Sequence, residues 1–281
     1  MKTIPAAKIK EIVSELCIRA NTILREDILS GLKTAYFKET DKRARDILKA
    51  VIDNASIAKK EKIPICQDTG LPVVFIEIGQ DVRIKGNLKQ AINKGVEEGY
   101  RKGYLRSSVI GDPLARGRSG YSPAVIHTEI VSGHKLKITV LPKGFGCENK
   151  TQLKMFNPTE KIEGIKEFIK NAVNYAGPDA CPAYIVGVGI GGTADYAVFL
   201  AKKALLKKVT RYSRKTQATS TSKLERDLLK SINKLNIGPM GLGGKTTCLG
   251  VNIETYPTHI AGLPVAVNIS CHALRSASAI L

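Results

Sequence analysis

Residues 184–195 read Tyr-Ile-Val-Gly-Val-Gly-Ile-Gly-Gly-Thr-Ala-Asp, and this stretch decides which fold classes remain open. The run from Tyr184 to Ile190 is typical of a buried strand, and a glycine turn and a helix from about Ala194 to Lys208 are predicted to follow it. Residues 187–192 match the Gly-x-Gly-x-x-Gly pattern of dinucleotide-binding folds, but the match is weak. Such folds usually place this turn after their first strand, with an acidic ribose ligand about 20 residues later. Here the turn comes late in the chain, and residues 207–215, where the acidic ligand would be expected, are basic. The hypothesis of an NADP oxidoreductase is therefore supported by this one weak pattern alone. The glycines can instead allow a close approach of the backbone to another element, or leave N–H groups for a carboxylate.

Apolar spacing predicts helices in the first sixty residues and strands after them. One helical face carries Ile9, Ile12, Val13, Leu16 and Ala20, and a second carries Ile47, Leu48, Val51 and Ile52 after a Thr40-Asp41 cap. Cys17 adjoins the first stripe and is interpreted as a packing residue. The pattern of apolar residues changes after residue 70, where residues 71–78 and 81–85 are typical of strands.

The remaining elements alternate between the two types. Residues 124–131 and 135–141 predict a hairpin around Ser132-Gly133-His134, on which His127 and His134 have structural roles. Asn157-Pro158 is predicted to open a helix that Gly177-Pro178 closes, and 246–254 and 263–269 are strand-like. The fold class is therefore mixed α/β (α+β), with an N-terminal helical part followed by a sheet-containing region, and it is not a simple Rossmann fold. Residues 1–281 are interpreted as a single domain, with two subdomains left open and no boundary assigned.

Composition limits the location and class of the protein. The chain has 281 residues and no apolar run near the roughly 20 needed to span a bilayer, and it begins without an apolar leader. Its six cysteines are too dilute for a disulfide scaffold, which favours a reducing compartment. We therefore expect a cytoplasmic protein with no membrane association.

The formal net charge of +19 raises nucleic acid and anionic small molecules as partners. Residues 202–234 hold eleven Lys and Arg against two Asp and Glu, and their polar part, 213–222, precedes a helix containing Leu224, Leu228 and Leu229. Tyr212 is the single aromatic residue of this stretch, and no nucleic-acid-binding motif accompanies it. A solvated connection is the preferred interpretation, and a basic nucleic-acid-binding module is a distant alternative.

Three cysteines lie in segments with turn-forming or polar neighbours. Cys66 begins Cys-Gln-Asp-Thr-Gly70, Cys181 lies in Gly177-Pro-Asp-Ala-Cys-Pro182, and Cys271 lies in Asn268-Ile-Ser-Cys-His-Ala-Leu-Arg275. A ligating thiolate needs such access and hydrogen bonding. From the residues alone, three scattered buried thiols are the favoured interpretation.

Five motifs in order carry a family resemblance. They are Cys66-Gln-Asp-Thr-Gly70, Lys143-Gly-Phe-Gly-Cys-Glu-Asn149, Val186-Gly-Val-Gly-Ile-Gly-Gly-Thr-Ala-Asp195, Gly241-Leu-Gly-Gly244 and His259-Ile-Ala-Gly-Leu-Pro-Val-Ala-Val-Asn268. Together they resemble the α subunit of the class I, iron–sulfur-dependent fumarate hydratase and tartrate dehydratase family. The resemblance runs from the N-terminal helices to the last residues.

The resemblance implies a cofactor. Cys66, Cys181 and Cys271 would be the ligands of a [4Fe-4S] cluster, with one iron not ligated by protein and able to act as a Lewis acid. Cys147 stands where the family more often has Ser or Ala. Cys17 and Cys248 match no ligand position.

The resemblance also implies substrate-contacting residues. Gln67 and Asp68 follow a cluster cysteine, and Asp68 would be the acid that protonates the departing hydroxyl. Arg106 matches a carboxylate-binding arginine whose planar fork suits bidentate contact. Gly146 would offer a backbone N–H or close approach. His259 matches a substrate-pocket histidine, for which a structural role is the rival interpretation.

The implied activity is the interconversion of malate and fumarate plus water, a step of the tricarboxylic acid cycle. An L(+)-tartrate dehydratase α subunit is the same-class alternative. A separate β subunit would supply further carboxylate-binding residues and the base, in an α2β2 assembly acting on a dicarboxylate. We expect no nucleic acid partner.

Overall fold

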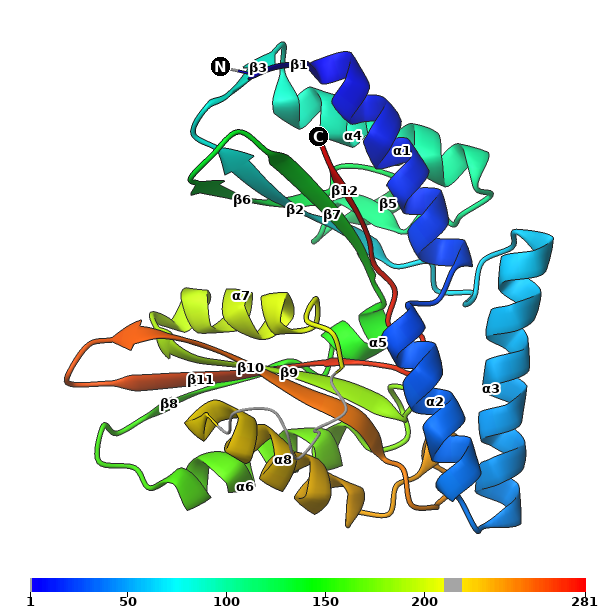
Figure 1. Cartoon of the computed structure of the whole chain (residues 1–281), viewed down its shortest axis with the longest axis vertical. Coiled ribbons are helices and arrows are strands. Elements are labelled where there is room, and N and C mark those ends of the chain that lie inside the picture. Colours follow the sequence, from blue (N-terminus) through cyan, green and yellow to red (C-terminus); the bar gives the residue numbers. More distant parts are fainter. Residues whose placement is uncertain (1, 210–218) are drawn as a thin grey trace. The chain divides into compact units, whose positions relative to one another are not determined.

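The computed structural model describes residues 2–209 and 219–281 and divides the chain into two compact units (Figure 1). Unit 1 consists of Met1–Arg25, Asn54–Phe145 and Arg275–Leu281. Unit 2 consists of Glu26–Asp53 and Gly146–Leu274. Each unit therefore combines segments that are distant in sequence.

Unit 1 is a four-stranded sheet covered by two helices. Its elements are β1 (Lys2–Pro5), α1 (Ala6–Thr22), the end of α3 (Lys42–Glu61), β2 (Leu71–Gly79), β3 (Val82–Lys85), α4 (Leu88–Lys102), β4 (Val109–Asp112), β5 (Arg116–Gly120), β6 (Val125–Val131), β7 (Leu136–Lys143) and β12 (Ala277–Ile280). The sheet has the order β12-β7-β2-β6, while β1 pairs with β3 and β4 with β5. Helices α1 and α4 pack against each other, and both contribute to one core with β2 and β7.

Helical periodicity explains this core. Ile9, Val13 and Leu16 of α1 are buried, as the apolar stripe predicted. Helix α4 presents a matching stripe of Ile92, Val96 and Tyr100, which are also buried. Helix α4 was not among the predicted elements, although its apolar residues recur at every fourth position.

The predicted hairpin of residues 124–131 and 135–141 is wrong. Strands β6 and β7 do form, but β2 lies between them, parallel to β6 and antiparallel to β7. The connection around Gly133 accepts hydrogen bonds from the end of β2 and from the turn after it, where the Asp81 N–H donates to the Gly133 carbonyl at 3.0 Å. In its central position strand β2 is more completely buried than β6, whose residues are mostly exposed or half-buried.

Unit 2 is a second four-stranded sheet with helices on both faces (Figure 1). Its elements are α2 (Glu26–Lys38), the start of α3, α5 (Phe145–Glu148), β8 (Gln152–Phe156), α6 (Ile162–Ala176), β9 (Tyr184–Gly192), α7 (Ala194–Ala204), α8 (Ser220–Asn233), the 3-10 turn η1 (Pro239–Gly241), β10 (Cys248–Thr258) and β11 (Leu263–Ser270). The strand order is β10-β9-β11-β8, with β9 parallel to β10 and antiparallel to β11. This mixed sheet confirms the predicted mixed α/β class without Rossmann order.

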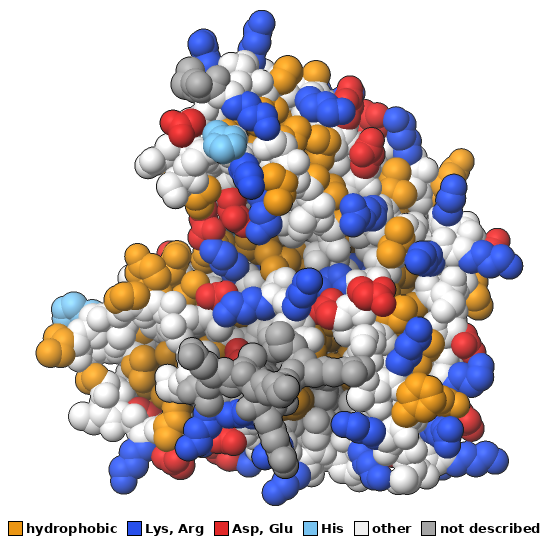
Figure 2. Space-filling view, in the orientation of Figure 1, with side chains coloured by type: hydrophobic (Ala, Val, Ile, Leu, Met, Phe, Trp, Pro, Cys, Tyr) orange, Lys and Arg blue, Asp and Glu red, His pale blue; other side chains and the backbone are white. Residues whose placement is uncertain are grey.

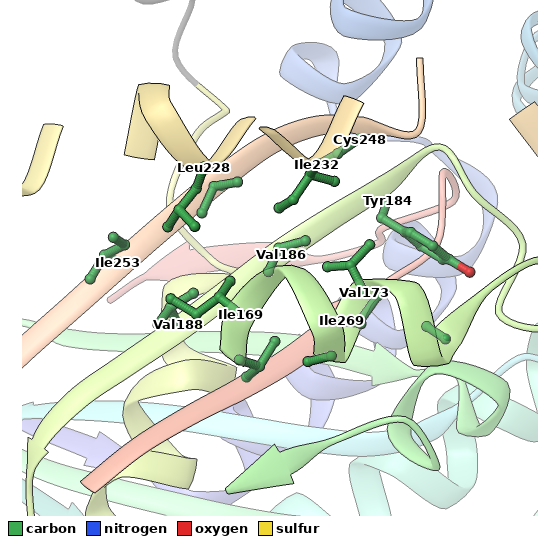
Figure 3. Packing of buried hydrophobic residues seen from close by; sticks show 14 of the residues in the cluster. Ile169, Val173, Tyr184, Val186, Val188, Leu228, Ile232, Cys248, Ile253 and Ile269 are labelled. Atoms are coloured by element: carbon green, nitrogen blue, oxygen red, sulfur yellow. The ribbon is translucent and has the colours of Figure 1, made fainter. Parts of the chain in front are cut away.

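Strand β9 separates the two faces of unit 2. Val186 and Val188 point into a core formed with α6 and α8, where Ile169, Leu228 and Ile232 surround them (Figure 3). The alternate residues Gly187 and Gly189 face α7. A Cβ on Gly189 would lie 2.0 Å from the Ala197 carbonyl oxygen, so the glycines allow α7 to approach the sheet. The glycine run therefore has a packing role, and it lies within β9 rather than in a turn after it.

Most predicted elements are confirmed, with shifted ends. Asp41 Oδ1 accepts the Ala44 N–H at 2.8 Å, as expected of the cap before α3. Helix α6 begins at Ile162 rather than Pro158, because Asn157 to Glu160 form a turn first. Helix α7 ends at Ala204, earlier than predicted. The predicted polar connection at 213–222 falls largely outside the described residues, and its last part begins α8.

Charged side chains are mixed over the visible face (Figure 2). Lys and Arg are scattered there among Asp and Glu rather than gathered in one stripe. Within the basic stretch, Lys202 pairs with Glu148, and Lys207 pairs with Glu254 at 2.9 Å. Across the described ranges, none of the helices combines the length and apolar character that crossing a bilayer requires.

Replacing Gly189 by Ala should destabilise unit 2 by about 2–3 kcal/mol, because α7 would have to move off the sheet. Gly262→Ala is the matched control, since its Cβ would meet only the Met155 Cε atom, at 3.8 Å. Calorimetric unfolding of both variants measures the effect. Equal unfolding temperatures for the two would contradict the close packing of α7 on β9.

Candidate functional site

The six cysteines fall into two groups by exposure. Cys17, Cys147 and Cys248 are buried, whereas Cys66, Cys181 and Cys271 are half-buried. Burial raises the pKa of the Cys17 and Cys248 thiols from 9.0 to about 12. The accessible group is the one that the family resemblance marks as cluster ligands, and the packing role predicted for Cys17 is confirmed.

Cys181 and Cys271 come together in unit 2. Cys181 lies in the loop between α6 and β9, and Cys271 follows the end of β11. The His272 N–H donates to the Cys181 carbonyl at 3.4 Å, and the His272 Nδ1 atom lies 3.2 Å from the same oxygen. Cys181 has a φ of 56°, in the left-handed region that non-glycine residues rarely adopt. Such strain is often found at functional sites.

Gly146 belongs to the same neighbourhood. It is exposed in the short helix α5, and a Cβ placed on it would meet only the Asp179 carbonyl oxygen, 4.0 Å away in the Cys181 loop. The adjacent Cys147 donates its thiol to the Ala180 carbonyl at 3.3 Å. The ion pair between Lys150 and Asp179, 3.0 Å long, joins the same two segments.

A polar cluster anchors α5 from its other side. Glu148 pairs with Lys202 of α7 and accepts a hydrogen bond from the Asn268 Nδ2 atom at 3.0 Å. Asn268 is fully buried in β11 and also donates to Thr151 at 2.8 Å. Unit 2 therefore holds Gly146 in a defined position relative to the Cys181 loop and to the strand that leads to Cys271.

Cys66, Gln67 and Asp68 lie in unit 1, in the loop between α3 and β2. Gln67 is exposed and Asp68 is half-buried. The Asp68 Oδ1 atom accepts the Gly70 N–H, and Oδ2 accepts the Phe145 N–H, both at 2.9 Å. These bonds fix the orientation of the carboxylate while leaving a lone pair on each oxygen.

Arg106 lies beside this loop. It follows α4, its side chain is exposed, and its N–H donates to the Thr69 Oγ1 atom at 3.0 Å. Unit 1 thus brings together four of the predicted site residues from two segments. The guanidinium remains accessible, as carboxylate binding requires.

His259 is not brought near the unit 2 cysteines. It lies exposed after β10, with its Nδ1 atom accepting the Ala261 N–H at 3.1 Å. The eight residues of β11, Leu263–Ser270, separate it from Cys271. At about 3.4 Å per residue, that strand spans about 24 Å.

Three buried polar residues of unit 1 were missed by sequence reasoning. Tyr100, Arg275 and Asn21 are each at most 3% exposed, and all contact the segment 65–70. Tyr100 could have been found from the apolar spacing of α4. Arg275 was visible in the Cys271 motif, but its role depends on a contact with a residue 207 positions away.

The three proposed ligands are divided between the units, with Cys66 in unit 1 and the other two in unit 2. Over the described part of the chain, no group of three His, Cys, Asp or Glu side chains forms a metal-binding arrangement. The ligand roles therefore stay predictions that require a chemical test.

Comparison with known proteins gives the family. Residues 10–280 match the family described as "Fumarate hydratase (Fumerase)". The chain belongs to the fumarate hydratase family.

A Methanocaldococcus jannaschii chain, named provisionally as an L(+)-tartrate dehydratase α subunit, is 41% identical over 278 residues that cover 96% of both chains. The L(+)-tartrate dehydratase α subunit of Escherichia coli K12 is 30% identical over 272 residues, which cover 95% of this chain and 89% of its own length. Membership in the fumarate hydratase family confirms the predicted class of enzyme, a hydro-lyase.

In the metal-free chain at pH 8, iodoacetamide should modify Cys66, Cys181 and Cys271 before Cys17 and Cys248. A thiol with a pKa near 12 is about 0.01% thiolate at pH 8, and the thiolate is the reactive form. Peptide mass spectrometry over time gives the order of modification. Equal rates for Cys17 and Cys66 would contradict the two exposure groups.

Proposed function

We propose that this chain is the α subunit of a [4Fe-4S]-dependent hydro-lyase that interconverts malate and fumarate plus water. The main support is that the three half-buried cysteines are the three that the family resemblance marks as cluster ligands, while the other three are buried. The relatives named as α subunits support a separate β subunit as partner. An α2β2 assembly in the cytoplasm remains part of this proposal.

The donor set fits the proposed cofactor. Cys66, Cys181 and Cys271 would hold the cluster, and Cys181 and Cys271 already lie on hydrogen-bonded segments. When bound, such a cluster offers one iron without a protein ligand as a Lewis acid for a hydroxyl and a carboxylate. Loss of hydroxide needs such help because hydroxide is a poor leaving group.

The chain's own residues would bind the substrate and supply a proton. The exposed Arg106 guanidinium can bind one carboxylate in a bidentate manner, and Gln67 and the Gly146 N–H can donate further hydrogen bonds. Asp68, held by two backbone N–H groups, would give its proton to the departing hydroxyl. The base that removes the proton from the neighbouring carbon would come from the β subunit.

L(+)-tartrate is the second candidate substrate, because the relatives carry that name. Both reactions remove water from a 2-hydroxy dicarboxylate, so the same residues would serve either one. The ratio of kcat/KM for malate to that for L-tartrate, measured on the anaerobic complex, decides between them.

Anaerobic reconstitution of the chain with its β subunit should yield a complex that binds iron and turns over one of these substrates. Cys181→Ser should lose iron and reduce turnover by roughly 100-fold or more, because one of three ligands is removed. Cys147→Ser is the matched control and should keep its iron, since the Cys147 thiol is buried and bonded to the Ala180 carbonyl. Equal iron loss in both variants would reject the ligand assignment, and full turnover by the chain alone would reject the two-subunit site.

His259 could act in the proposed pocket only at the cluster of another copy of the chain, since β11 keeps it away from its own Cys271. We therefore expect that the variants Cys271→Ser and His259→Asn, each inactive alone, restore activity when they are mixed in one assembly. In such an assembly one active site combines the cluster bound by the His259→Asn chain with the His259 side chain of the Cys271→Ser chain. Activity of doubly tagged, co-purified assemblies measures this.

A mixture of Cys271→Ser and Cys181→Ser is the control, because neither chain can then hold a cluster. If the first mixture is no more active than its parents, His259 does not act between copies.

A further inference from the structure

Arg275 is a buried cation whose shortest hydrogen bond goes to the main chain of the proposed acid. It is 3% exposed, and its Nη2 atom donates to the Asp68 carbonyl at 2.7 Å. Its Nη1 atom donates to the Asn21 Oδ1 atom at a longer 3.4 Å. Among the described residues, its buried Nε–H has no hydrogen-bond partner.

Burying a guanidinium in this state is unfavourable for stability. A buried charge destabilises the folded state unless an opposite charge and full hydrogen bonding compensate it. The contacts of Arg275 are to a carbonyl and a side-chain amide, both neutral. An apolar side chain here would remove the donor that the Asp68 carbonyl receives from Nη2, so the value of the guanidinium lies in the bond that it makes to Asp68.

The hydrogen bond from Arg275 is one of several that hold segment 65–70, at Ile65, Asp68, Thr69 and Gly70. The Asn21 carbonyl accepts the Ile65 N–H at 2.9 Å. The Tyr100 hydroxyl lies 3.0 Å from both the Thr69 and Gly70 carbonyls. Arg275 supplies the contact at Asp68, between these two attachments.

Gly144 lies close to both the Arg275 guanidinium and the Asp68 carboxylate. A Cβ on Gly144 would lie 3.3 Å from the Asp68 Oδ2 atom and 3.9 Å from the Arg275 Nη2 atom. Both groups therefore lie around one small residue. Arg275 holds the carbonyl of Asp68, while the Phe145 and Gly70 N–H groups hold its carboxylate.

We propose that Arg275 is a positioning residue that sets the backbone of Asp68, and through it the direction of the Asp68 carboxylate toward the substrate. This inference rests on the proposed function, in which Asp68 transfers a proton. Arg275 itself touches no substrate. Its removal should therefore lower kcat and leave KM nearly unchanged.

A double-mutant cycle in the anaerobic complex with the β subunit tests this. Arg275→Met keeps the length of the side chain and removes its donors, and it should lower kcat per bound cluster roughly 10- to 100-fold. In an Asp68→Asn background, the same change should have almost no further effect on kcat, because Arg275 acts through Asp68. Arg275→Lys, which keeps the charge and N–H donors but loses the planar fork, should recover part of the loss.

Thr139→Val is the matched control in unit 1. It removes a part-buried hydrogen bond between the Thr139 and Ser278 hydroxyls, 2.8 Å long, which joins β7 to β12 and does not touch segment 65–70. This variant should lose stability without losing kcat per cluster. Iron content and unfolding temperature are recorded for every variant.

Hydrogen exchange on the metal-free chain gives a readout independent of turnover. Amides of residues 65–70 should exchange faster in Arg275→Met than in Thr139→Val. Tyr100→Phe, which removes the neighbouring attachment, should have a similar effect on exchange if Arg275→Met does not assemble.

The inference is overturned if Arg275→Met leaves both kcat and exchange unchanged, or if it lowers kcat equally with Asp68 and with Asn at position 68. Failure of the proposed function looks different. A wild-type complex that turns over neither malate nor tartrate rejects that function, while faster exchange in Arg275→Met would still support the positioning of the segment.

Discussion

A buried main-chain carbonyl needs a hydrogen-bond donor, and both loops that carry proposed ligands depend on this requirement. In unit 1, the segment after Cys66 has its carbonyls satisfied by Arg275 and Tyr100. In unit 2, the carbonyls of Ala180 and Cys181 are satisfied by the Cys147 thiol and by His272. Neither loop belongs to a sheet at that point, so side chains and the main-chain N–H of His272 replace the ladder bonds that a strand would provide. The cost of leaving such carbonyls unpaired explains why polar residues are buried next to the proposed site.

The two sheets serve this arrangement in different ways. In unit 2, β9 and β11 run side by side, so Cys181 before one and Cys271 after the other meet at the same end of the sheet. The antiparallel pairing is what brings them together, because the start of one strand then lies beside the end of its neighbour. In unit 1, β2 begins directly after the Cys66 loop, and the buried Gly70 at its start has a φ of 76°. A Cβ there would lie 2.6 Å from the Pro142 carbonyl carbon, so glycine is required where the loop enters the sheet.

Local periodicity predicted the helices α1 and α3, the strands β2, β9, β10 and β11, and the mixed class of the fold. It failed at the pairing of β6 with β7, because a turn and two alternating runs say nothing about a third strand that can enter between them. The net charge of +19 raised nucleic acid and anionic small molecules as partner classes, and composition by itself could not choose between them. Part of the basic stretch is used in ion pairs, such as that of Lys207 with Glu254.

The sequence by itself determined the family, the type of chemistry and the candidate residues, because five short motifs keep their residue types and order along one chain. It also separated Cys17 as a packing residue from its helical spacing. Only the tertiary structure decided which cysteines are accessible, that His259 lies a strand's length from Cys271, and that Arg275 supports Asp68. The physical reason is the range of the interactions. Spacing along a helix or strand is local, whereas burial and the pairing of a guanidinium with a carbonyl 207 residues away exist only after the segments have packed.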